Sequence, residues 1–343
     1  MSLRFQMFGP GLDPSRTLCV DGRAFGLRSL SHWPGPPPPP PLAHDVTTGM
    51  ALAYARCSED QRRELLGEID VVTNDHYDTD GALSLFAFLD PATALRHEDL
   101  MVRAATTGDF RTWHGEDALA VDLTVWAIRD AAGSPLRQRL DAIDDYFVAS
   151  ELCYEWVLEH MPQILDEPMR WSSLWQPRFD RIIQERQRLL EGGVKVERHE
   201  DLDLAVIRLL APATRHTIVA AADDLYRVLV VHESEQGLHY RFSYRNESWF
   251  MGLRDRVPPR LHLDDTVRAL DELEGDGPRW WCTPIDTTSA QLGLGSVERQ
   301  TNVFDDFRPD LDPPSRLSPA QVVETLRAAL GASPAREATG GQP

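Results

Sequence analysis

The stretch that decides the fold is residues 69–84, Ile-Asp-Val-Val-Thr-Asn-Asp-His-Tyr-Asp-Thr-Asp-Gly-Ala-Leu-Ser. Its first five residues carry the β-branched side chains that suit a buried strand, and the apolar run from Gly81 to Leu89 is typical of a helix. A histidine and several aspartates lie between the two. Because carboxylates this close together repel one another, a cation or a bound proton must offset their charge. A divalent ion at the end of the strand is the simplest explanation.

The composition indicates a protein of ordinary size with a strong negative charge. The chain has 343 residues, of which 42% are hydrophobic, which is enough for two domains with packed cores. Its formal net charge of −19 gives it a field that repels nucleic acid and anionic membranes. We therefore expect a small-molecule substrate, with neither a nucleic acid nor a membrane as partner, and the sequence does not predict the oligomeric state.

The cysteines and the N-terminal residues favour a cytoplasmic location. The four cysteines lie far apart in the sequence, so neither a zinc knuckle nor a disulfide framework is indicated. The first residues lack the basic segment and apolar core of a signal peptide, and no stretch approaches the roughly 20 apolar residues of a membrane-spanning helix.

The N-terminal half repeats the order strand, loop, helix. Residues 17–33 predict a short hairpin or two strands, with Asp21-Gly22 as the turn, and the proline-rich run at 35–41 predicts an extended loop. A helix from about residue 47 to 54 follows, capped by Asp45 or Thr47. The strand at 69–73 and the helix at 81–89 repeat this order, which is typical of parallel sheets whose ligands bind at the carboxyl ends of the strands.

The rest of the chain divides into a helical segment and a second, β-rich region. Apolar residues at three- and four-residue spacing predict helices within residues 100–105, 118–128, 136–158 and 179–190. After Gly192-Gly193, short strands are predicted at 194–196, 204–209, 217–221, 226–231 and 238–244. A helix at 265–274, a strand at 279–281, a loop-rich stretch at 284–318 and a helix at 319–330 complete the chain.

The predicted fold class is therefore α/β. A metal-binding catalytic domain with a parallel sheet and a helical segment spans residues 1–192. A smaller β-rich α+β domain that binds substrate or acts as a cap spans residues 193–331, and residues 332–343 form a disordered tail.

The acidic loop does not match a calcium-binding loop. In His76-x-Asp78-x-Asp80-Gly81, histidine would occupy the first position of such a loop and Ala87 the twelfth, where a glutamate is required. An imidazole beside carboxylates favours manganese, zinc or iron. We predict Mn²⁺, or another divalent metal, as the cofactor.

The strand followed by His-x-Asp-x-Asp-Gly, a serine and a helix resembles the first motif of the DHH phosphoesterase superfamily. In that family the motif supplies histidine and aspartate ligands to a two-manganese centre, and a smaller β-rich substrate domain follows. The resemblance implies that His76, Asp78 and Asp80 are metal ligands and catalytic residues. The Asp-His-His triplet of that family is absent here. The chain also resembles an uncharacterised bacterial family that shares its Ser-His-Trp, Asp-Thr-Asp-Gly and Gly-Asp-Phe segments.

Further candidates could complete the metal site. They are Asp75 in the same loop, Asp109 in the Gly-Asp-Phe segment, Asp45 with the neighbouring His32 and His44, and the pair Glu116-Asp117. Each of these acids has a structural alternative, because aspartates and glutamates commonly cap helices.

Two arginines are candidates for substrate binding. Arg241 and Arg245 alternate with aromatic residues along a predicted strand, where they could bind a phosphate group, although a structural sheet face would have the same pattern.

The leading functional prediction is a divalent-metal-dependent hydrolase of a phosphoester or phosphoanhydride in a small nucleotide-like molecule, acting by attack of a metal-bound water. Two alternatives from other classes stay open. One is a metal-dependent carbon-nitrogen hydrolase or biosynthetic enzyme, and the other is a catalytically degenerate ligand-binding protein.

Overall fold

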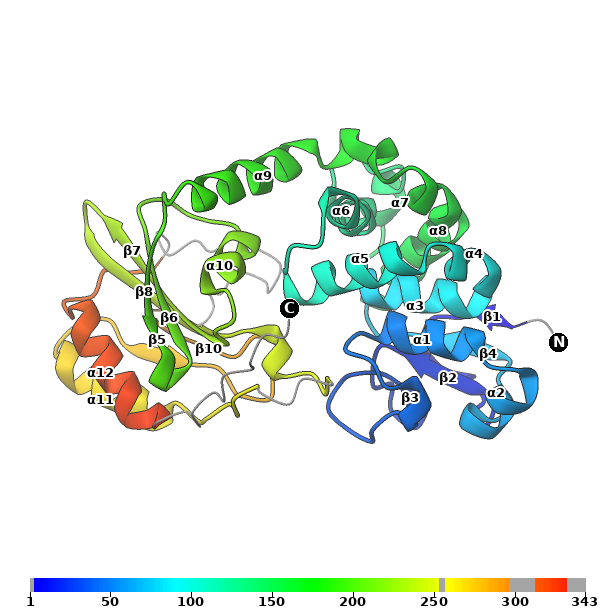
Figure 1. The fold of residues 1–343 in the computed structure, drawn as a ribbon, viewed down its shortest axis with the longest axis horizontal. Coiled ribbons are helices and arrows are strands. Elements are labelled where there is room, and N and C mark those ends of the chain that lie inside the picture. The colour runs from blue at the N-terminus through cyan, green and yellow to red at the C-terminus, as the bar shows by residue number, and fades with distance from the viewer. Residues whose placement is uncertain (1–2, 253–256, 296–311, 332–343) are drawn as a thin grey trace, which may run out of the picture. The chain divides into compact units, whose positions relative to one another are not determined.

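The computed structural model describes residues 3–252, 257–295 and 312–331 and divides the chain into two compact units (Figure 1). Unit 1 comprises Met1–Arg181 together with Phe250–Asp255, and unit 2 comprises Ile182–Trp249 and Arg256–Pro343. The mixed α/β class predicted from the sequence is confirmed, with a parallel sheet in unit 1 and a second, mixed sheet in unit 2. The predicted boundary at residue 192 lies just beyond helix α9 (Gln176–Leu190), whereas the division falls inside this helix. The tail at 332–343 lies outside the described residues.

The sheet of unit 1 has four parallel strands in the order β1 (Arg4–Phe5), β4 (Val71–Thr73), β2 (Thr17–Val20) and β3 (Arg28–Leu30). Every residue of β2 and β4 is buried. Parallel sheets are stable when both faces are covered, so their central strands are apolar on both faces. This explains the run Thr-Leu-Cys-Val and the run Val-Val-Thr.

Helix α3 (Thr79–Leu89) is the central helix of unit 1. All its residues from Thr79 to Phe88 are buried, and it packs against α1, α5 and α8 as well as the sheet. A helix that is buried on every side is a core helix. The other helices of this unit are η1 (Pro40–Leu42), α1 (Thr47–Arg56), α2 (Glu59–Leu66), α4 (Pro91–Arg96), α5 (Glu98–Phe110), α6 (Glu116–Asp130), α7 (Arg137–Leu140), α8 (Tyr146–Asp166) and η2 (Pro168–Leu174).

Two predictions in unit 1 are wrong in detail. Of the two alternatives given for residues 17–33, the two strands are confirmed and the hairpin is wrong, because β3 runs alongside β2 in the same direction. The single helix predicted at 136–158 is two helices, α7 and α8. Asp145 ends the connection between them, since its carboxylate accepts hydrogen bonds from the backbone N–H groups of Phe147 and Val148, at 2.8 and 3.0 Å.

Unit 2 contains a six-stranded sheet with helices on both faces. The strand order is β5 (Lys195–His199), β6 (Leu204–Leu209), β7 (Arg227–Ser234), β8 (Gly237–Tyr244), β10 (Gln291–Leu294) and β9 (Trp280–Cys282). Successive residues of a strand point to opposite faces. In β6, Leu204 and Val206 therefore pack into one apolar core, and Ala205 and Ile207 pack into the other. Helix α10 (Arg215–Ala222) contributes to the second core, and α12 (Pro319–Leu330) contributes to the first, where α11 (Asp264–Glu274) packs against it.

The strand predicted at residues 217–221 is wrong, because these residues lie in α10. Strands β6 and β7 are parallel neighbours, and such a pair needs a crossover connection, usually a helix. Thr214 caps this helix through Thr217 N–H. The loop predicted at 284–318 also contains β10, which pairs with β8 and β9.

Among the described residues, no helix combines the length and the apolar character needed to cross a membrane.

Replacing Leu83 by alanine tests the central position of α3. This side chain is fully buried, so we expect Leu83→Ala to lower the free energy of unfolding by about 2 to 5 kcal/mol through lost burial and the cavity left behind. Urea denaturation followed by circular dichroism measures the change. The control is Leu273→Ala on the surface of α11, where the side chain is 51% exposed and we expect an effect below about 1 kcal/mol. Equal losses in the two variants would contradict the assignment of α3 as a core helix.

Candidate metal centre

Three parallel strands of unit 1 are followed by polar residues at the same edge of the sheet. Asp21 directly follows β2, His32 lies just after β3, and residues 74–78 follow β4. Since the carboxyl ends of parallel strands lie together, these side chains meet. Asp80, in the first turn of α3, joins them.

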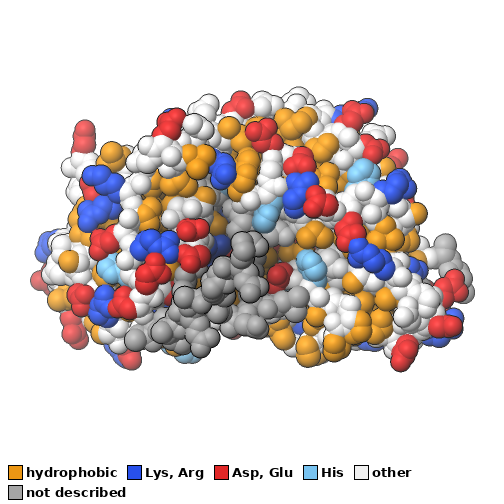
Figure 2. Space-filling view, viewed as in Figure 1, with side chains coloured by type: hydrophobic (Ala, Val, Ile, Leu, Met, Phe, Trp, Pro, Cys, Tyr) orange, Lys and Arg blue, Asp and Glu red, His pale blue; other side chains and the backbone are white. Residues whose placement is uncertain are grey.

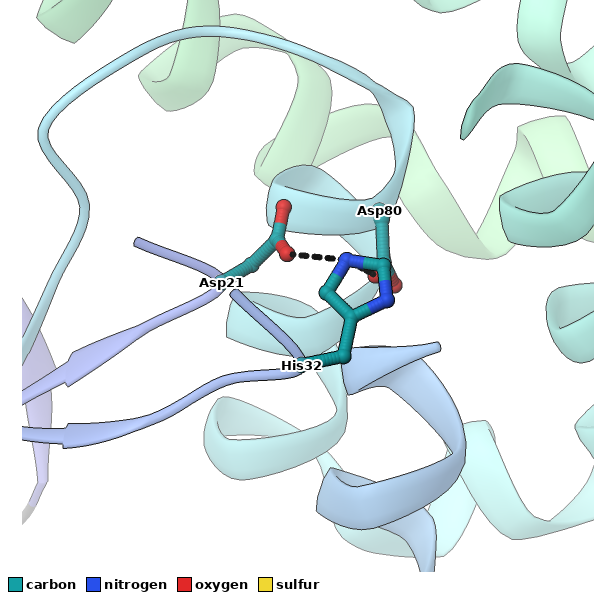
Figure 3. A group of neighbouring side chains, drawn as sticks. All are labelled: Asp21, His32 and Asp80. Carbon is teal, nitrogen blue, oxygen red and sulfur yellow. Dashed lines mark ion pairs between the residues drawn. The ribbon is translucent and has the colours of Figure 1, made fainter. Parts of the chain in front are cut away.

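Asp21, His32 and Asp80 form a buried cluster, here called the inner group (Figure 3). His32 Nε2 lies 3.3 Å from Asp21 Oδ1 and 3.6 Å from Asp80 Oδ2, and all three side chains are at most 1% exposed. Asp109 Oδ2, from α5, lies 3.3 Å from the same nitrogen. On the other side of the ring, Nδ1 lies 2.6 Å from the backbone carbonyl of Asp45, and donation to this carbonyl leaves Nε2 free to act as a ligand.

Asp21, His76 and Asp78 form a second cluster, here called the outer group. His76 Nε2 lies 3.0 Å from Asp78 Oδ2 and 3.7 Å from Asp21 Oδ2. His76 Nδ1 lies 3.0 Å from Asp75 Oδ1. The side chains of His76 and Asp78 are 21% and 15% exposed, so this group is accessible where the inner group is not. Asp21 belongs to both groups, with Oδ1 toward His32 and Oδ2 toward His76.

The N-terminus of α1 holds Asp80 in place. Its carboxylate accepts hydrogen bonds from the backbone N–H groups of Thr47 and Thr48, each at 2.7 Å, and from the Thr48 hydroxyl at 2.6 Å. The Thr47 hydroxyl donates to Asp21 Oδ1 at 2.9 Å. One helix N-terminus therefore orients two of the three residues of the inner group, and the helix dipole favours the negative charge there.

Asn74 links the ends of β2 and β4. Its side-chain amide donates to the backbone carbonyl of Asp21 at 3.3 Å, and its side-chain oxygen accepts from His76 N–H at 2.8 Å. Tyr154 donates to the carbonyl of His76 at 2.8 Å. A Cβ at Gly81 would lie 2.5 Å from both Asn74 Nδ2 and Tyr154 Oη, so only glycine fits at this point of the Asp-Thr-Asp-Gly motif.

The buried carboxylates repel one another. Burial raises the pKa of Asp21 to about 7, and the charges of Asp80 and Asp78 add to the effect. Burial also raises the pKa of Asp109 well above its usual value, with a further contribution from the same charges. Without a bound cation, some of these acids retain their protons near neutral pH.

Burial has the opposite effect on the pKa values of the two histidines, because it disfavours the protonated, charged form of an imidazole. Burial alone would lower the pKa of His32, but the neighbouring Asp21 and Asp80 carboxylates outweigh it and raise this pKa. The pKa of His76 is raised well above its usual value in the same way, mainly by Asp78. For Asp78, burial works against ionisation, but His76 lowers its pKa. Protonated imidazoles can thus take the place of a cation.

Two atoms at the centre indicate what would fit there. Asp21 Oδ2 and His32 Nε2 are buried and make no hydrogen bond within the described part of the chain. An unsatisfied buried polar atom is costly, and a metal ion would satisfy both kinds of atom. Ligand atoms that share an ion at roughly 2.1 Å lie about 3 to 4 Å apart. The nitrogen-to-oxygen distances within the two groups, 3.0 to 3.7 Å, are in this range, and the donor set suits Mn²⁺, Fe²⁺ or Zn²⁺.

The structure brings most of the predicted ligands together. His76, Asp78 and Asp80 belong to the two groups, and Asp75 and Asp109 contact a histidine of one group each. Asp45 differs, because its backbone carbonyl contacts His32 and its carboxylate belongs to neither group.

The two acidic candidates of α6, Glu116 and Asp117, belong to neither group. Asp117 forms a bidentate ion pair with Arg103 at 2.7 and 2.8 Å.

The sequence prediction missed Asp21, the residue that the two groups share. The sequence pattern assigns Asp21-Gly22 to a turn and gives its carboxylate no role, although Asp21 follows the buried strand β2 directly and its carboxylate faces both groups. An aspartate directly after an apolar strand was the available signal. His32 is among the candidates of the sequence analysis, and the parallel pairing of β3 with β2 places it at the centre of the site.

The two arginines proposed to bind substrate are paired within unit 2. Arg241 is buried, forms an ion pair with Asp312 and lies over the Trp281 ring, 4.8 Å from its centre. Arg245 forms a buried ion pair with Glu247. Both guanidinium groups are thus neutralised by carboxylates of the chain, which corresponds to the structural alternative given for this strand.

Comparison with known proteins gives a family but no activity. The chain belongs to a family of unknown function (DUF6687), whose model matches residues 1–340. This agrees with the resemblance to an uncharacterised family, and it gives no support for membership of the DHH superfamily. No curated protein matches the chain.

The metal-free protein should lose stability as the pH rises. The pKa of Asp21 is about 7 in the folded chain and about 4 in the unfolded chain, so its contribution to stability declines as the pH rises between these values. His32 and His76, whose pKa values are raised, contribute stability below about pH 6.5 that is lost as the pH rises through their folded-state values. Asp78 has a lowered pKa, so its contribution to stability is lost as the pH falls, and this loss occurs only in acid.

Thermal unfolding in the presence of a chelator at pH 5.5 and pH 8 measures this effect. We expect a lower Tm at pH 8, and a larger recovery on addition of Mn²⁺ at pH 8 than at pH 5.5, because the metal binds deprotonated ligands. The variant Asp21→Asn should show a weaker dependence on pH. A chelated wild-type protein whose Tm rises between pH 5.5 and pH 8 would contradict the electrostatic description of the site.

Proposed function

We propose that this member of the family DUF6687 is a divalent-metal-dependent hydrolase of a phosphoester or phosphoanhydride in a small molecule. The observation that carries the proposal is the position of Asp21, whose two carboxylate oxygens face two adjacent sets of ligating atoms. A carboxylate shared in this way suits a pair of neighbouring cations. When bound, such a pair supplies an activated water and neutralises the charge that develops on a phosphoryl group.

The site can bind an anionic substrate only when cations neutralise its carboxylates. Around two histidines, the site gathers the carboxylates listed here: Asp21, Asp75, Asp78, Asp80 and Asp109. Such a cluster would repel a phosphate group in the metal-free protein. We infer that divalent ions convert it into a site that attracts phosphate.

The two groups have different exposures and therefore different roles. The inner group is fully buried, and its ligands are fixed by α1 and by the carbonyl of Asp45. It suits an ion that stays bound. The outer group is partly exposed through His76 and Asp78, so we propose that substrate and water approach on this side.

A small-molecule substrate is consistent with the distribution of charge. On the face shown in Figure 2, Lys and Arg side chains are scattered among Asp and Glu side chains. Nucleic-acid binding proteins gather their basic residues in a continuous stripe or patch. A nucleotide-like substrate, Mn²⁺ as the resident ion and a cytoplasmic location stay predictions from the sequence.

Metal analysis tests the site directly. After chelation and reconstitution with Mn²⁺, we expect the wild-type protein to bind two equivalents, measured by mass spectrometry of the metal. Asp21→Asn should lose both, because Asp21 belongs to both groups. The matched control is Asp117→Asn, the same substitution at an acid paired with Arg103 in the same unit, which should keep two equivalents. Wild-type uptake below about a tenth of an equivalent would refute the proposal.

An activity screen tests the reaction class. With Mn²⁺, Co²⁺ or Zn²⁺, we expect release of phosphate or a phosphomonoester from bis-p-nitrophenyl phosphate, inorganic pyrophosphate or nucleoside di- and triphosphates. Asp78→Asn should lower kcat/KM on the order of 100-fold, since it removes a ligand on the exposed side. Release of an amine or ammonia from amide substrates would support the carbon-nitrogen hydrolase instead. Metal-loaded protein that binds these phosphates without turnover would support the ligand-binding alternative.

A further inference from the structure

We infer that Phe250 and Trp33 are positioning residues for the metal centre, each setting the ring orientation of one histidine. Phe250 acts on His32 of the inner group, and Trp33 acts on His76 of the outer group. The inference rests on the proposed metal-binding function and adds residues outside the set of ligands.

Phe250 stacks on the ring of His32. The ring centroids are 4.0 Å apart with an interplanar angle of 22°, and Phe110 packs edge-on against Phe250 at 5.5 Å. The next residue, Met251, donates its backbone N–H to the carbonyl of His32 at 2.6 Å. Phe250 is far from His32 in sequence but belongs to unit 1, so this segment returns to the site.

Stacking supplies a constraint that the hydrogen bond of His32 does not. The contact of Nδ1 with the carbonyl of Asp45 fixes one edge of the imidazole, but the ring can still rotate about that contact. A flat ring packed against its face fixes the plane as well. Together they aim Nε2 at Asp21, Asp80 and Asp109.

Trp33 has the equivalent position beside His76. Its ring lies 4.8 Å from the imidazole, at an angle of 38°. The backbone around Trp33 is anchored, because its carbonyl accepts a hydrogen bond from Arg23 at 2.6 Å and its N–H donates to Ser31 at 3.1 Å. The consecutive residues His32 and Trp33 therefore serve different groups: the first as a ligand, and the second as support for a ligand.

A general packing role makes a different prediction from a positioning role. If the two aromatic rings only filled space, removing either would lower the stability of unit 1 and weaken metal binding at both groups alike. If each ring orients one histidine, the effects separate by group. Each variant is then the matched control for the other.

The experiment compares stepwise Mn²⁺ binding in Phe250→Leu and Trp33→Leu by calorimetry and electron paramagnetic resonance. The variants His32→Ala and His76→Ala identify which binding step belongs to which group. We expect Phe250→Leu to weaken Mn²⁺ binding at the inner group about tenfold, with little change in binding at the outer group. Trp33→Leu should weaken binding at the outer group and leave the inner group little changed. Phe250→Tyr, which keeps a flat ring, should bind Mn²⁺ at the inner group about as tightly as the wild-type protein. Equal weakening of both steps in both variants, or no change in either, would overturn the inference.

A second readout uses the metal-free protein and separates this inference from the proposed function. In histidine side-chain NMR spectra, Phe250→Leu should shift the resonances of His32 and leave those of His76 in place, and Trp33→Leu should do the opposite. If the wild-type protein binds no metal but these reciprocal shifts occur, the proposed function fails and the positioning contacts stand. If metal binds but the shifts are absent, the positioning role fails alone.

Discussion

The electrostatic repulsion among buried carboxylates around Asp21 is the constraint on which the rest of unit 1 depends. Asp21 is 1% exposed and lies between two histidines, with Asp80 and Asp109 close to one of them. In the low dielectric of a protein interior these charges interact strongly. The folded chain offsets them through the N–H groups and hydroxyls at the start of α1 and through the imidazoles of His32 and His76.

The architecture explains why the charges meet where they do. Three parallel strands end at one edge of a sheet, and the loops after them supply an aspartate, a histidine and the acidic motif. The first turns of α1 and α3 complete the site with the N–H groups of Thr47 and Thr48 and the carboxylate of Asp80. A site built from strand ends and helix starts is held rigidly, because its parts begin or end regular elements.

The acidic motif could be recognised from the sequence because all of its parts are close together in the chain. The strand, the His-x-Asp-x-Asp-Gly segment and the buried helix all lie within residues 69–89, and the α/β class follows from their order. The position of Asp21 between two groups and the helical state of residues 217–221 depend on which strands are neighbours, and the local sequence pattern does not give that order. The role of Asp45 could not be predicted from the sequence either. The carboxylate was the predicted ligand, but it is the backbone carbonyl that contacts His32. Arg241 of β8 pairs with Asp312, which is distant in sequence, so this partner could not be found from the local pattern, whereas Arg245 pairs with Glu247 only two residues away.

The short return of the chain at Phe250 has a consequence for how unit 1 can be obtained alone. This unit is discontinuous in sequence, since Phe250–Asp255 belongs to it while the residues on either side belong to unit 2. An N-terminal fragment that stops at residue 181 or 192 would expose the face of His32 that the phenyl ring covers. A shortened protein designed to fold as unit 1 alone must therefore include Phe250–Asp255, joined to residue 181 by an added linker.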